Sequence, residues 1–239
     1  MKFRALFFSL VLFSLSGCAI ILDEEVGNGN RVTEEKSLSR FENLEVSGSF
    51  DVELVPSTEY RVVIEADENI QEFILIDQDG DKLKIQLKDQ IRISIKGKIK
   101  VTVYMEKLRS VDLAGSGLVK TRSQMTHPDK MEFSIAGSGD MELDVKSPSV
   151  EISIGGSGEL KAMGKTERLE VDIAGSGDFN GLELLSEVTE VSIAGSGNAS
   201  VYASRELDVS VAGSGDVEYK GNPSVTKSIA GSGSVKSIQ

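Results

Sequence analysis

Seven serines of this chain stand between two glycines, a setting that invites comparison with a catalytic nucleophile. A hydrolase nucleophile needs the pattern Gly-x-Ser-x-Gly and a histidine base. Here the repeated pattern is Ala-Gly-Ser-Gly, and the sole histidine, His127, lies in the loop-like Thr126–Asp129. No Gly-Lys-Ser/Thr follows, as a phosphate loop would require. We therefore predict no enzyme activity and assign the first glycine of each copy, the ruler glycine, to a structural turn: Gly115, Gly137, Gly156, Gly175, Gly195, Gly213 and Gly231.

Carboxylates recur five residues before five successive ruler glycines, and we call this set the acidic column: Glu132, Glu151, Glu170, Glu190 and Asp208. Oxygen ligands of this kind suit Ca²⁺, which could bridge them. The alternative is a solvated face that prevents edge pairing with other chains. Neighbours about 4.8 Å apart in water would repel by about 0.9 kcal/mol, which a fold tolerates. Both interpretations remain open.

Two further polar columns follow the same ruler. A mostly hydroxyl column stands three residues before it: Asp112, Ser134, Ser153, Asp172, Ser192, Ser210 and Ser228. A corner column follows each Gly-Ser-Gly: Asp140, Glu159, Asp178, Asn198 and Asp216. One cysteine and one histidine cannot build a Cys/His metal cluster, so we expect no metal of that class and no cofactor.

The elements that must position these columns are strands. Ruler glycines are 18 to 22 residues apart, which is a solenoid period. Apolar residues alternate two, four and six positions before the ruler, as in Met131, Phe133 and Ile135, which predicts strands with one buried face. Lys227 breaks this inward row in the last copy, as a terminal coil tolerates. We predict an all-β parallel β-solenoid of about seven coils over residues 111–239.

Residues 41–110 alternate without the ruler and predict about six strands. Asp79-Gly80 and Lys96–Lys98 are expected turns of hairpin type, and residues 67–73 could form one or two helical turns. Val46–Phe50 resembles a degenerate copy of the repeat. We expect this β-rich segment to be continuous with the solenoid or to cap it, because an open sheet edge invites pairing with other chains.

The first residues of the chain predict its cellular location. Lys2 and Arg4 precede an apolar stretch typical of a secretory signal. Leu15–Cys18 resembles the lipobox of bacterial lipoproteins, so we predict a signal peptide at 1–17 and acyl chains such as palmitate on Cys18, the only thiol. Ala19, which follows the cysteine where an inner-membrane lipoprotein would have Asp, resembles the sorting signal of outer-membrane lipoproteins. Residues 18–40 are expected to form the acylated terminus and a flexible tether, and the side of the membrane stays open.

Composition excludes some partners. The chain carries 26 Lys and Arg against 38 Asp and Glu, and loss of Lys2 and Arg4 would leave a formal charge of about −14. Such a surface lacks the basic stripe that nucleic acid requires. Trp is absent, so aromatic platforms for sugar or base stacking are scarce.

The segment FENLEVSGSFDVEL, the EADENI stretch and the repeated IAGSGD together resemble the head GIN domain family of auto-transporter adhesin heads. The resemblance covers residues 41–239 and implies a non-catalytic, envelope-associated solenoid with an adhesive role toward an unknown protein or glycan. We expect the lipid on Cys18 to anchor it. The alternatives are a periplasmic structural protein, a possible homo-oligomer that self-assembles through coil edges, and a polysaccharide-cleaving enzyme with an acidic cleft.

Overall fold

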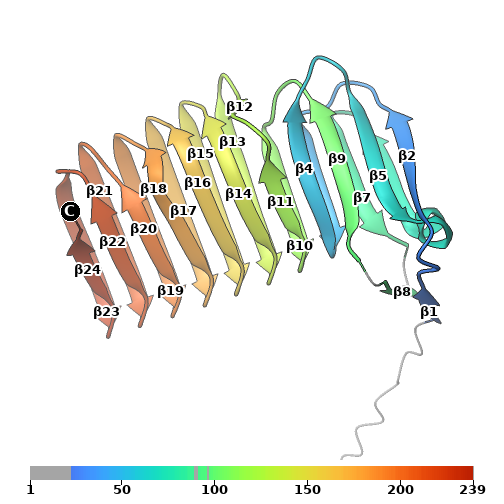
Figure 1. Ribbon diagram of the computed structural model, residues 1–239. Helices are drawn as coiled ribbons and strands as arrows, with labels where there is room; N and C mark the ends of the chain where they lie inside the picture. The colour runs from blue at the N-terminus through green and yellow to red at the C-terminus, as the bar shows by residue number, and fades with distance from the viewer. Residues whose placement is uncertain (1–22, 89–90, 96, 239) are drawn as a thin grey trace, which may run out of the picture.

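The computed structural model describes residues 23–88, 91–95 and 97–238. Cys18 and the predicted signal peptide lie outside these ranges. The chain forms a stack of parallel coils, and each coil contributes one strand to each of two large sheets (Figure 1). The predicted all-β parallel solenoid is confirmed.

One strand of each coil belongs to the ten-stranded sheet and ends at the glycine corner. These strands are β3 (Asn43–Gly48), β10 (Ser110–Gly115), β13 (Lys130–Gly137), β15 (Ser149–Gly156), β17 (Arg168–Gly175), β19 (Val188–Gly195), β21 (Glu206–Gly213) and β23 (Ser224–Gly231).

The strand after each corner belongs to the twelve-stranded sheet. These strands are β4 (Phe50–Pro56), β11 (Leu118–Thr121), β14 (Asp140–Lys146), β16 (Glu159–Lys165), β18 (Asp178–Leu185), β20 (Asn198–Tyr202), β22 (Asp216–Lys220) and β24 (Ser234–Ser237), with the short β12 (Met125–Thr126) beside β14. The degenerate copy at Val46–Phe50 is therefore a true coil, because Gly48 pairs in register with Gly115.

The N-terminal segment extends the stack and closes its end. Strands β7 (Lys82–Leu87) and β9 (Ile99–Met105) pair in parallel with β3 and β4 and so form a coil outside theirs. Beyond it, β6 (Ile74–Asp79) and β5 (Arg61–Asp67) pair antiparallel with β7 and β9, and the 3-10 helix η1 (Glu68–Phe73) joins them. The expected turn at Asp79-Gly80 is confirmed between β6 and β7.

Two expectations for this segment are wrong. The flexible tether of residues 18–40 contains β1 (Asp23–Val26) and β2 (Arg31–Ser37), because β2 gains an antiparallel partner in β5 and covers its edge. The hairpin expected around Lys96–Lys98 does not form, because β8 (Ile91–Ser94) pairs with β1, whereas β9 pairs with β4 and β5; Lys96 itself lies outside the described residues.

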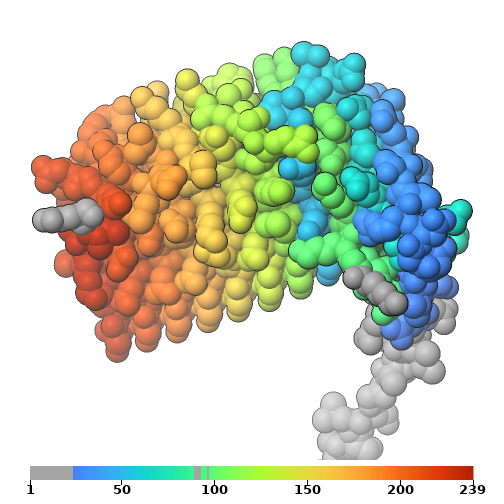
Figure 2. All heavy atoms as spheres, viewed as in Figure 1, coloured from blue at the N-terminus to red at the C-terminus, as the bar shows by residue number. Residues whose placement is uncertain are grey.

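The two halves share one hydrophobic core. Inward residues of the solenoid and of the N-terminal segment form a single buried cluster that runs from Phe41 to Val217. Met131, Phe133 and Ile135 are at most 2% exposed, as the alternation predicts. Figure 2 shows the resulting rod, whose lower edge is stepped at each coil. The solenoid is therefore one continuous body with its N-terminal cap.

Glycine is required twice at each corner, for different reasons. Gly195 has φ 135°, a left-handed conformation that favours glycine, and a Cβ there would lie 2.2 Å from the Gly175 carbonyl oxygen. The second glycine of each described corner does not have a positive φ. Gly197 is needed because a Cβ would meet the Gly177 oxygen at 2.3 Å. Both glycines let successive corners approach closely.

Gly195→Ala should lower the free energy of unfolding by about 2 kcal/mol or more, because it adds backbone strain to a clash with the corner below. Ala194→Ser, an exposed neighbour, is the matched control and should change stability little. Urea denaturation measures both. Equal stability of the two variants would contradict the close stacking of corners.

The last described coil has one open side. Strand β23 pairs only with β21, and Lys227 is the register partner of buried Val209. Lys227 is exposed nonetheless, and Ile229 beside it is 38% exposed. An inward-pointing charge on an edge strand discourages pairing with another chain. The charge at this position therefore disfavours the pairing of β23 with a strand of another chain.

Lys227→Val should let β23 pair with a strand of another chain, because it leaves the inward row of this edge strand apolar. The average molecular mass in solution should then increase with protein concentration. Sedimentation velocity measures this, with Lys236→Val on the outward face of β24 as the control. A wild-type chain that already assembles would instead support the structural alternative.

Candidate interaction surfaces

The acidic column is confirmed as a geometric row. Glu132, Glu151, Glu170, Glu190 and Asp208 are successive register partners on the outer face of the ten-stranded sheet. Lys130 partly neutralises its first members. Its Nζ lies 2.8 Å from Glu132 Oε1 and also contacts Glu151, and these hydrogen bonds raise the pKa of Lys130 well above its usual range.

Glu170, in the middle of the column, has a raised pKa. Partial burial raises the pKa of Glu170, and the negative charges of Glu151, Asp172 and Glu190 raise it further. In the described ranges no three Asp, Glu, His or Cys side chains are placed to hold a metal ion. A flat row offers each ion few convergent ligands, so cation bridging stays a hypothesis.

Glu170→Gln should raise the free energy of unfolding at pH 7 by about 0.5 kcal/mol, because it removes a carboxylate that repels its neighbours. Because its pKa is raised, Glu170 binds a proton more readily in the folded state than in the unfolded chain. The destabilisation by its ionised carboxylate therefore grows as pH rises above about 4.3, the unperturbed pKa of glutamate. The gain should vanish at pH 3, where the carboxyl is protonated in both states.

Thermal denaturation at the two pH values measures this effect, with the exposed Glu142→Gln on the other sheet as control. Destabilisation by Glu170→Gln at pH 7 would show that the column is held by attraction. Stabilisation of the wild type by millimolar Ca²⁺, absent in the variant, would support the cation hypothesis.

The hydroxyl column is also in register beside the acidic one. Ser134 Oγ donates to Asp112 Oδ1 at 2.7 Å, the first step of that row. Next to it runs a row of exposed small residues that includes Ala174, Ala194 and Ala212. Together they line a shallow, open depression of about 460 Å³ over Ser153–Ala212.

The corner column has a structural role that the sequence analysis missed. Asp178 Oδ1 accepts the backbone N–H of Asn198 at 3.1 Å, and Asn198 Oδ1 accepts that of Asp216 at 3.1 Å. Asp216 in turn accepts from Ser234, and these hydrogen bonds lower the pKa of Asp216. These polar side chains tie each corner to the next rather than facing a ligand.

The return turns that join one coil to the next are capped by hydroxyl side chains. Thr166 Oγ1 donates to the Arg168 carbonyl at 2.9 Å, and Ser147 Oγ donates to that of Ser149 at 2.5 Å. Both hydroxyl residues are at most 6% exposed. A sequence feature that could have predicted these turns is a hydroxyl residue nine positions before the ruler glycine: Ser147, Thr166, Ser186 and Ser204.

His127 occupies the equivalent place in the turn before Ser147 and has a structural environment. Its side chain is 2% exposed, its Nδ1 accepts the Asp129 backbone N–H at 3.1 Å, and its Nε2 lies 3.4 Å from Glu42 Oε2. The Arg40 guanidinium beside Glu42 lowers the pKa of that carboxyl, and His127 adds to the effect. His127 therefore holds the N-terminal segment against the solenoid, at the edge opposite the Gly-Ser-Gly corners.

The predicted lipidation site, Cys18, lies outside the described residues. Within the ranges that the structure covers, the helical content is too short and too polar to provide a membrane span.

Residues 40–223 match the family model described as "Putative auto-transporter adhesin, head GIN domain". No curated protein matches significantly. Among solved structures, a "putative lipid binding protein" from Parabacteroides distasonis is 28% identical with a TM-score of 0.77, covering 91% of this chain and 100% of its own. A "putative adhesin" from Bacteroides fragilis is 21% identical with a TM-score of 0.85, covering 90% and 100%. Another from Parabacteroides merdae is 22% identical with a TM-score of 0.72, covering 91% and 100%; these two support the fold alone.

Proposed function

Because this chain belongs to the head GIN domain family, we propose that it is a non-catalytic lipoprotein of the bacterial cell envelope whose solenoid serves as an adhesive surface. The observation that carries the proposal is repetition in register. Three outward rows, one acidic, one mostly hydroxyl and one of small residues, recur on successive coils of the ten-stranded sheet. Weak contacts repeated along one rigid rod reinforce one another when the partner also repeats.

The position of the predicted anchor suits display. The first described strand begins at Asp23, five residues after Cys18, a span of at most about 18 Å. A lipid on Cys18 would therefore hold the capped end of the stack near the membrane. The repeats would project away from it, as the positions of β1 and the C-terminal strands at opposite ends indicate (Figure 1).

Charge argues against membrane lipid as the adhesive target. The chain has a formal net charge of −12, so its rod would be repelled by anionic headgroups. We therefore propose a protein or glycan ligand rather than the lipid that one relative is named for. Self-assembly through coil edges remains the alternative for a periplasmic protein, since β23 and β24 each have one unpaired side among the described strands.

The test is binding of the fluorescently labelled full chain to an array of immobilised polysaccharides and extracellular-matrix proteins. We expect saturable binding to at least one class, retained after Glu170→Gln and lost when the protein is unfolded before labelling. Absence of binding to every surface, together with concentration-dependent mass in solution, would reject adhesion in favour of self-assembly.

A further inference from the structure

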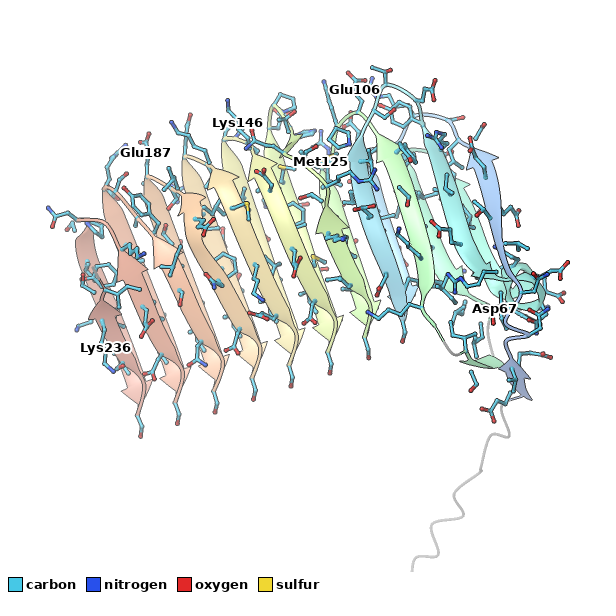
Figure 3. The ribbon with its side chains drawn as sticks, in the orientation of Figure 1. Asp67, Glu106, Met125, Lys146, Glu187 and Lys236 are labelled. Atoms are coloured by element: carbon cyan, nitrogen blue, oxygen red, sulfur yellow. The ribbon has the colours of Figure 1, made fainter. Side chains whose placement is uncertain are left out.

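A hollow of about 640 Å³ lies along the return-turn edge of the solenoid. It spans the turns of successive coils near the N-terminal segment, and Figure 3 shows Lys146 at this edge. Its lining combines lysines with proline rings: Lys107, Pro128, Lys146, Pro148 and Lys165, beside His127 and Glu167. No motif of the sequence analysis accounts for it.

The charge of this hollow is opposite to that of the whole molecule. Lys107, Lys146 and Lys165 form no ion pair with a carboxylate in the described part of the chain, although most other lysines of the N-terminal half do. Lys146 and Lys165 are exposed register partners on β14 and β16, so their ammonium groups recur at the coil spacing of about 4.8 Å. Glu167 is the only carboxylate among the lining residues. Unneutralised cations brought together in this way favour an anionic partner.

The backbone of this edge has little to offer a peptide. The amide groups of His127, Ser147 and Thr166 each donate to a carbonyl of the next coil, at 3.2, 3.3 and 2.9 Å. A peptide strand that joins a sheet edge gains its affinity from main-chain hydrogen bonds, and these donors are already used. The hydroxyls of Ser147 and Thr166 are likewise engaged in capping their own turns. What remains is lysine side chains and apolar ring surface.

We propose that this hollow binds an acidic polysaccharide, a chain of sugars that carries carboxylate groups. The chain lies along the rod, so that lysines of successive coils meet successive carboxylates. Charge-assisted hydrogen bonds from ammonium to carboxylate give the affinity. Pro128 and Pro148, on neighbouring turns, supply apolar surface for the sugar rings in a molecule without tryptophan. This inference rests on the proposed adhesive function and names its ligand class.

The experiment measures binding of polygalacturonate to the purified full chain by calorimetry at low salt. Lys146→Gln combined with Lys165→Gln should weaken binding about tenfold or more, since a charge-assisted hydrogen bond contributes on that scale. The control combines Lys161→Gln with Lys236→Gln, which removes the same charge from the face of the sheet; Figure 3 shows Lys236 well away from the hollow. The control should bind as the wild type does.

Each other outcome overturns the proposal. Failure of the wild type to bind polygalacturonate rejects the ligand class, and equal weakening by the two double variants reduces the effect to net charge. Polyglutamate binding as tight as polygalacturonate would show that sugar rings contribute nothing. Array binding to other surfaces, with none to polygalacturonate, would leave the adhesive function standing and remove this inference alone. Unchanged thermal denaturation of each variant confirms that folding is not the cause.

Discussion

The structure depends on the approach of one glycine corner to the next. Ser157 N donates to the Gly137 carbonyl at 2.8 Å, and Ser176 N donates to that of Gly156 at 2.8 Å. A Cβ at the ruler glycine would occupy the place of the neighbouring carbonyl. The spacing between coils is therefore set by backbone hydrogen bonds, and the strands on both sides of the corner inherit one register. The acidic, hydroxyl and small-residue rows on the rod's surface follow from that register.

Because the register is fixed, residues at the same position of successive repeats lie side by side on the surface. On the ten-stranded sheet it places like charges side by side, which raises the pKa of Glu170 and gives the face an electrostatic cost. At the corner it places Asp178 and Asn198 where each caps the next backbone amide, so equally polar residues stabilise the stack. At the opposite edge it brings Lys146 beside Lys165. The same constraint thus produces a repulsive face, a structural seam and a basic hollow.

Much of this could be predicted from the sequence because the repeat is local. The period, the inward row and the acidic column need only counting from the ruler glycine. The order of the first coils could not be read in this way: β7 and β9 lie outside β3 and β4, although they follow them in the chain. Strand β2 is mostly polar and shows no alternation that predicts a strand. It forms because β5 offers it an antiparallel partner, which its own sequence does not reveal. The hollow was missed because its lysine row is short: Lys146 and Lys165 end β14 and β16, and the next coil has Leu185 at that position.

The central claim is that a lipid on Cys18 displays this solenoid from the cell envelope, and protease accessibility on intact cells tests it most directly. An antibody against the repeats would follow the full chain before and after protease, with lysed cells and Cys18→Ala as controls. The account predicts loss of signal on intact cells, and release of the Cys18→Ala chain from the membrane fraction. Protection on intact cells with digestion only after lysis would contradict display and favour a structural role in the periplasm.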